Sequence, residues 1–113
     1  MPRYHLSLSP VDRGGYAATL MDTRFGWPIE FGRCSKQWID GKAAIYGDST
    51  GALPGWSLTI RPTEEPEMFS ATATDGRHFR IAFPECELEH EGGRGMLNGW
   101  AEEADIITEE FAS

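Results

Sequence analysis

The clearest structural signal in this chain is an alternation of apolar and polar residues between positions 68 and 91. Apolar side chains occupy every second position from Phe69 to Ala73, and again from Phe79 to Phe83. A period of two residues predicts strands with one buried face. The segment Thr74-Asp75-Gly76 between the two runs predicts the turn of a β-hairpin.

The length of that turn sets the register of the hairpin. A two-residue Asp-Gly turn would place hydroxyl side chains opposite the apolar row. A three-residue loop over 74–76, with Gly76 in the left-handed conformation, places Ala71 opposite Phe79. Phe69 then lies opposite Ile81, so that apolar residues face each other. We predict the three-residue loop, because a slip by one residue would turn every side chain to the other face.

The alternation changes phase at Pro84. Proline has no N–H to donate, so we expect Pro84 at a bulge, a sheet edge or a strand boundary. Beyond it, Cys86 and Leu88 are the less polar positions. The opposite face carries four carboxylates, which repel each other unless they face water or a basic partner. These residues are Glu85, Glu87, Glu89 and Glu91.

Shorter alternating runs predict further strands. They cover positions 4–8, 16–20, 25–31, 43–46 and 56–60. Positions 35–40 fit either one helical turn or a strand that enters an Asp-Gly turn. We detect no internal repeat.

The spacing of apolar residues lengthens after the Gly-rich connection 92–99. Trp100, Ala104, Ile107 and Phe111 lie four, three and four residues apart, which predicts an amphipathic helix over 100–112. Ile106 lies on the outer face of this helix, either as a contact anchor or as an exposed isoleucine without a role. Acidic residues surround it there: Glu102, Glu103, Asp105, Glu109 and Glu110.

These elements predict one α+β domain over residues 1–113. A β-rich part, 1–91, would form a twisted antiparallel sheet of five to seven strands, with a half-barrel as its curled form. The C-terminal helix would pack on that sheet. We expect no secretory leader, and no apolar run reaches about 20 residues. We therefore expect a cytoplasmic protein without a membrane segment, in which Cys34 and Cys86 are reduced.

The charge of the chain is unevenly distributed. Residues 1–84 carry nine acidic and nine basic side chains, whereas residues 85–113 carry nine acidic and one basic. The net charge of −8 therefore belongs to the last quarter of the chain. Direct binding to nucleic acid is not expected of this quarter, because such binding depends on Lys and Arg at phosphates. A basic protein is the electrostatic complement.

No catalytic, cofactor or metal site is predicted. His90 lies between Glu89 and Glu91, but neighbouring residues of a strand point to opposite faces and do not chelate one ion easily. Cys34 and Cys86 lie outside any recognised nucleophile motif. The sequence thus favours a binding protein over an enzyme.

Our leading hypothesis is a small acidic inhibitor that blocks a nucleic-acid-binding enzyme, either by presenting carboxylates where the target binds phosphates or by occlusion. Phage-encoded anti-CRISPR proteins and toxin-immunity proteins are analogous in class only. We expect a monomer or homodimer, acting in the host cytoplasm if the protein is phage-encoded. The predicted partner-binding residues are Glu85, Glu87, Glu89, Glu91, Glu102, Glu103, Asp105, Ile106, Glu109 and Glu110.

Two alternatives remain. The first is a small-molecule-binding or enzymatic β-barrel, whose pocket would use Trp27, Trp38, His78 and Arg80. The second is a structural subunit of an assembly, which the acidic helix would solubilise or seat.

Overall fold

The chain folds into strands joined by turns and short connections. A computed structural model describes residues 3–11, 15–24, 26, 28–39, 41–50, 55–65, 67–77, 79–91, 94–102 and 106–108. The strands are β1 (Tyr4–Pro10), β2 (Tyr16–Asp22), β3 (Pro28–Ile39), β4 (Lys42–Asp48), β5 (Ser57–Pro62), β6 (Met68–Thr74), β7 (Phe79–Glu91), β8 (Arg94–Ala101) and β9 (Ile106–Thr108). In these ranges no helix is long and apolar enough to cross a membrane.

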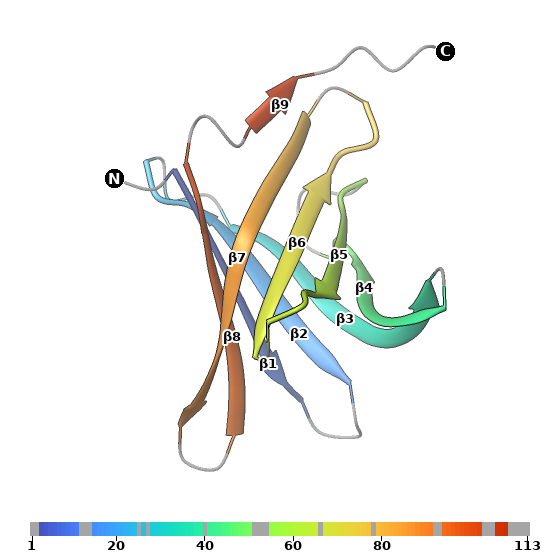
Figure 1. Ribbon diagram of the computed structural model, residues 1–113. Coiled ribbons are helices and arrows are strands. Elements are labelled where there is room, and N and C mark those ends of the chain that lie inside the picture. The colour runs from blue at the N-terminus through green and yellow to red at the C-terminus, as the bar shows by residue number, and fades with distance from the viewer. Residues whose placement is uncertain are drawn as a thin grey trace.

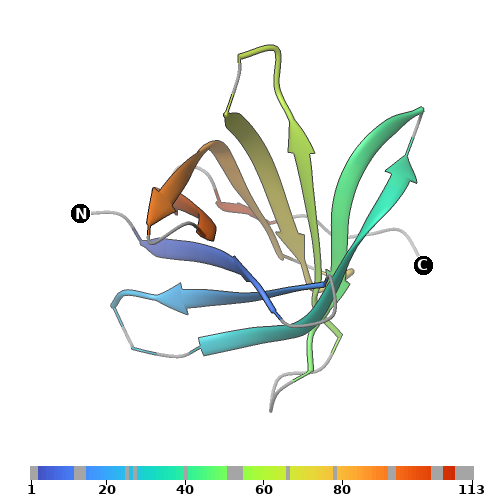
Figure 2. The ribbon, with the colours of Figure 1, turned by 90° about the horizontal axis from the view of Figure 1, so that it is seen from below.

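The first eight strands close into an antiparallel barrel. Each strand pairs with the next one in the chain, and β8 returns to pair with β1 (Figure 1). Closure leaves none of these eight strands with a free edge along the sheet. The short strand β9 adds to the beginning of β7, opposite Phe79–Ile81. The barrel can be followed from below in Figure 2.

The predicted α+β fold with a C-terminal helix and a half-barrel is wrong, because the described chain is all-β and closed. Of the residues in the predicted helical stripe, Trp100 lies in β8 and Ile107 in β9, while Ala104 and Phe111 lie outside the described residues. Without β8, both β7 and β1 would leave a row of backbone groups unpaired. Residues 94–101 form β8, whose backbone pairs with β1 on one side and with β7 on the other. A helix of about a dozen residues is marginal by itself, so this pairing prevails.

The predicted three-residue hairpin loop is also wrong, although the apolar face is the predicted one. Ala73 lies opposite Ile81 and Ala71 opposite Phe83, a shift of four positions. The longer connection is held by Asp75 Oδ1, which accepts hydrogen bonds from the backbone N–H of residues 77 and 79 at 2.8 and 3.0 Å. Gly76 has the predicted left-handed conformation, with φ of 73°.

The predicted irregularity at Pro84 is confirmed as a β-bulge. Ala71 pairs with Phe83, whereas Phe69 pairs with Cys86. Between these two pairs, β7 therefore contains one residue more than β6. Pro84 and Glu85 are exposed in this bulge. The extra residue changes the phase of β7 and thereby returns Cys86 to the interior.

A second bulge of the same kind reveals an internal repeat. In β3, Phe31 pairs with Ala18, but Cys34 pairs with Tyr16. The strands β1 to β4 therefore match β5 to β8 at an offset of 52 residues, or 53 for β2 and β6. The identical matched positions are Leu6 and Leu58, Pro10 and Pro62, Ala18 and Ala71, Thr19 and Thr72, Asp22 and Asp75, Ile29 and Ile81, Phe31 and Phe83, Cys34 and Cys86, and Gly47 and Gly99.

The repeat was not predicted from the sequence, for a physical reason. The matched residues lie mainly on the inner face, so dissimilar outward residues separate them along each strand. The offset also changes by one residue between strands, which breaks a simple alignment.

The two ends of the barrel differ in packing. One end holds the connections β2–β3, β4–β5 and β6–β7, and its interior is filled by buried residues such as Phe31, Phe83, Leu6 and Leu58. The other end, which we call the mouth, holds the connections β1–β2, β3–β4, β5–β6 and β7–β8. It faces downward in Figure 1.

Candidate functional site

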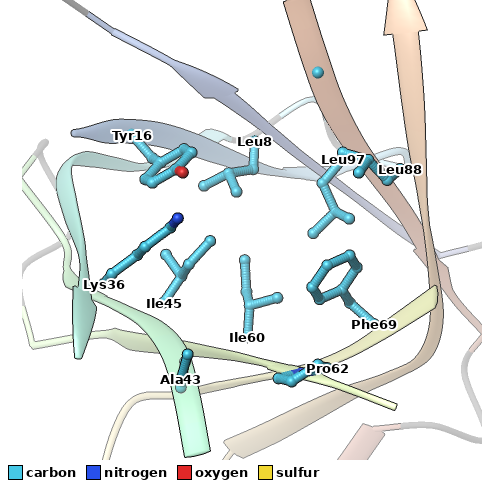
Figure 3. A pocket seen from close by; sticks show the side chains of 12 residues that line it. Leu8, Tyr16, Lys36, Ala43, Ile45, Ile60, Pro62, Phe69, Leu88 and Leu97 are labelled. Carbon is cyan, nitrogen blue, oxygen red and sulfur yellow. The ribbon is translucent and has the colours of Figure 1, made fainter. Parts of the chain in front are cut away.

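The mouth of the barrel encloses a cavity of about 370 Å³. Its walls are mainly aliphatic and aromatic, with Leu8, Ile45, Ile60, Phe69, Leu88 and Leu97 among the lining residues (Figure 3). An eight-stranded barrel is just wide enough either to be filled by side chains or to hold one small ligand. Here the closed end is filled and the mouth is hollow.

The internal repeat explains why the cavity lies at this end. The lining contains two matched pairs, Leu8 with Ile60 and Ile45 with Leu97, whose members lie on opposite sides of the cavity (Figure 3). The matched aromatic pair in this lining, Tyr16 and Phe69, is only partly buried, whereas Phe31 and Phe83 at the closed end are fully buried. Volume is therefore left between the aliphatic side chains.

Two matched positions break the apolar symmetry of the lining. Tyr16 corresponds to Phe69, and Lys36 corresponds to Leu88. Tyr16 and Lys36 are diagonal neighbours on adjacent strands, because Tyr16 pairs with Cys34, two residues before Lys36. Figure 3 shows the Lys36 amine and the Tyr16 hydroxyl on the same side of the cavity.

The described lining of the cavity contains a single charged side chain. Among the described lining residues, Lys36 carries the only formal charge, and it is exposed to solvent. The β5–β6 connection at this end carries Glu64, Glu65 and Glu67, all exposed and none of them in the lining. A ligand in the cavity would thus meet mainly apolar walls, one ammonium group and the Tyr16 hydroxyl.

The two thiols lie in the filled interior, one at each bulge. Burial raises the pKa of Cys34 to about 11, and the nearby Asp48 adds to the rise against a backbone hydrogen bond. Burial raises the pKa of Cys86 to about 12. Both thiols are therefore protonated at neutral pH, and a nucleophilic role is disfavoured.

Each thiol is enclosed by a matched contact. The Sγ–H groups of Cys34 and Cys86 donate to the carbonyl oxygens of Phe31 and Phe83, at 3.5 and 3.7 Å. Opposite them on the next strand are Gly47 and Gly99. A Cβ added at these glycines would lie 2.4 and 2.5 Å from the respective sulfur.

Three residues of the predicted acidic surface lie together on β7. The described residues form no helix that would bring the remaining acidic residues to them. Glu85, Glu87 and Glu89 are exposed on the outer face of β7, as the alternation predicted. Glu102 is exposed just after β8. Glu91 lies in β7 and Ile106 in β9, but their side chains are not described; Glu103, Asp105, Glu109 and Glu110 lie outside the described residues.

The pocket residues predicted for the barrel alternative do not form this cavity. Trp38 is 78% exposed and is not among the lining residues, and Arg80 lies near the closed end, opposite Thr74. Trp27 and His78 lie outside the described residues. The missed signal was the inward phase of Tyr16 and Lys36, which becomes visible once the bulge in β3 is counted.

An outer cluster crosses β1, β8 and β7. Asn98 Oδ1 lies 3.1 Å from His5 Nε2, and Asn98 Nδ2 donates to Glu89 at 3.2 Å. His5 stacks on Trp100 with ring centroids 4.0 Å apart. Asn98 separates the imidazole from the carboxylate, so they are not a bonded acid–base pair. No group of three metal-ligating side chains occurs among the described residues.

Comparison with known proteins found no match, whether to a protein-family model, to a curated protein or to a solved structure. Function is therefore inferred from the barrel and its cavity.

Proposed function

We propose that this protein binds a small, largely apolar molecule in the mouth of the barrel. The observation that carries the proposal is the cavity of about 370 Å³ between aliphatic and aromatic walls. Its volume falls in the usual range for ligand pockets, roughly 300–1,000 Å³. Burial of an apolar ligand there would gain roughly 25 cal/mol for each Å² of apolar surface removed from water.

The binding test uses a neutral apolar fluorophore, N-phenyl-1-naphthylamine, whose emission rises in apolar surroundings. Ala43 lines the mouth and is exposed, so Ala43→Trp should fill part of the cavity without crowding the core. We expect this change to weaken probe binding about tenfold or more, which corresponds to ~1.4 kcal/mol. The matched control is Ala17→Trp, since Ala17 neighbours the buried Ala18 on β2 and faces outward.

The outcomes separate clearly. Probe binding that is weakened by Ala43→Trp and unchanged by Ala17→Trp supports a ligand site in the mouth. Absence of binding to the wild-type protein, or equal loss in both folded variants, contradicts it.

The acidic face of β7 supports a second candidate, the inhibitor of a nucleic-acid-binding enzyme. The supporting observation is the row of exposed carboxylates at Glu85, Glu87 and Glu89, beside Trp100, which is 51% exposed on β8. Closely spaced carboxylates resemble phosphates in charge, and a basic target would be attracted to them.

This candidate is tested by replacing Glu85, Glu87 and Glu89 with Lys. Wild-type protein should capture a basic nucleic-acid enzyme at low salt, and the triple variant should not. A variant with Lys at 64, 65 and 67 changes the charge equally at the mouth and serves as control. Undiminished capture by the folded β7 variant would rule this candidate out.

A further inference from the structure

The asymmetry of the cavity points to the chemistry of its ligand. The repeat places the same kind of residue on both sides of the cavity at most levels, for example Leu8 with Ile60. At two levels the first half has a polar residue, Tyr16 or Lys36, where the second half has Phe69 or Leu88. Because the second half closes its wall with apolar residues at these positions, we expect that the polar pair is not needed to close the barrel.

The polar pair lies where a ligand head group would be. Tyr16 and Lys36 come from adjacent strands and extend into the same side of the cavity (Figure 3). Lys36 is exposed, so its ammonium group stays hydrated at the rim while its aliphatic stem lies along the wall. An ammonium group offers three donors and no acceptor, and a phenol can donate one more hydrogen bond.

We propose that the ligand is an amphipathic carboxylate, with its apolar chain in the cavity and its carboxylate bound by Lys36 and Tyr16. This inference rests on the proposed ligand site in the mouth and names the class of molecule that it takes. A charge-assisted hydrogen bond holds the head group in place. The exposed Glu64, Glu65 and Glu67 lie outside the lining, where water and salt weaken their repulsion of a carboxylate.

The experiment compares three ligands with the same ten-carbon chain. Decanoate, decanol and decylamine are titrated calorimetrically into the wild-type protein, at concentrations below micelle formation and at pH 7.5. We expect decanoate to bind about tenfold more tightly than decanol, as one charge-assisted hydrogen bond allows. Decylamine should bind more weakly than either, because its ammonium group would face Lys36.

The substitutions are taken from the other half of the barrel. Lys36→Leu and Tyr16→Phe install the residues that stand at the matched positions 88 and 69. Lys36→Leu should lower decanoate affinity about tenfold and leave decanol affinity unchanged or slightly raised, and Tyr16→Phe should have a smaller effect in the same direction. Lys36→Arg should retain the preference. Arg61→Leu removes an exposed positive charge from β5, outside the lining, and serves as control.

Failure of this inference differs from failure of the ligand site itself. If decanol binds as tightly as decanoate, or if Lys36→Leu weakens both equally, the mouth binds ligands but the carboxylate assignment is wrong. Tighter binding of decylamine overturns it as well. If none of the three ligands and no neutral probe binds, the ligand site is wrong and the assignment falls with it.

Discussion

The matched Cys–Gly contacts lead to a stability prediction that can be worked out from distances. A Cβ at residue 99 would lie 2.5 Å from Cys86 Sγ, so Gly99→Ala forces either the sulfur or the strand to move. Overpacking of this kind typically costs about 1–3 kcal/mol. The Gly→Ala change also lowers the entropy of the unfolded chain, which stabilises the fold by only about 0.4–1 kcal/mol. We therefore expect Gly99→Ala to lower the free energy of unfolding by about 1–2 kcal/mol.

Removing the sulfur should relieve this cost. Without Cys86 Sγ, the nearest atoms to the new Cβ are Cys86 Cβ at 3.4 Å and Phe83 Cβ at 3.6 Å, which are ordinary contacts. Cys86→Ala by itself creates a small void in a fully buried site and costs about 1 kcal/mol. In the double variant the methyl group added at position 99 occupies part of that void. The double variant should therefore be more stable than the sum of the single effects predicts, by about 1 kcal/mol or more.

The matched contact between Cys34 and Gly47 provides an internal comparison. At Gly47, removal of Cys34 Sγ leaves Arg33 O and Cys34 Cβ, both 3.2 Å from the new Cβ. These contacts remain too tight and one of them is backbone, so Cys34→Ala should rescue Gly47→Ala less than Cys86→Ala rescues Gly99→Ala. The ranking follows from distances alone.

The assay is urea denaturation followed by tryptophan fluorescence, with comparison of midpoints at constant slope. A neutral effect of Gly99→Ala would refute the reasoning. The reasoning would also be refuted if the stability losses of Gly99→Ala and Cys86→Ala were strictly additive. Equal rescue of stability at the Cys86–Gly99 and Cys34–Gly47 contacts would refute it as well.

Four further predictions concern the two thiols, the turn at Asp75 and the cavity. Both thiols should react with Ellman's reagent at pH 8 only on unfolding, and fast labelling of the folded protein would contradict their burial. Because burial raises both folded pKa values above 9.0, to about 11 and 12, the neutral thiols stabilise the fold fully below pH 9. This stability is lost as pH rises through 9–12, by about 1 kcal/mol per thiol at pH 10; a Cys34→Ala/Cys86→Ala variant should show a shallower alkaline decline. Asp75→Ala removes the acceptor for two backbone N–H groups and should cost about 1–2 kcal/mol in urea denaturation, whereas an equal loss in Thr72→Ala, outside the turn, would point to a general effect. Lys36→Leu should leave the urea midpoint nearly unchanged, since Lys36 is exposed and leucine stands at the matched position 88; a large loss would show that Lys36 stabilises the barrel itself.

The sequence alone determined the local features of the strands. The alternation placed Ile81 and Phe83 in the interior and Glu85, Glu87 and Glu89 outside. Proline's missing N–H located an irregularity at residue 84, which the structure shows to be a bulge, and glycine's freedom located the left-handed turn residue at 76. Each of these depends on a residue and its immediate neighbours, which is why pattern alone was sufficient.

The tertiary structure decided the closure of the barrel, the register and the cavity. Trp100 fits a helical stripe as well as a strand, and only the unpaired edges of β1 and β7 favour the strand. The hairpin shifted by four positions because the side chain of Asp75 holds a longer turn. Tyr16 and Lys36 meet only when β2 and β3 pair across a bulge, and their partners in the repeat lie about fifty residues away. Pairing over such separations depends on which backbone groups are left to satisfy, and no local pattern of side chains encodes that.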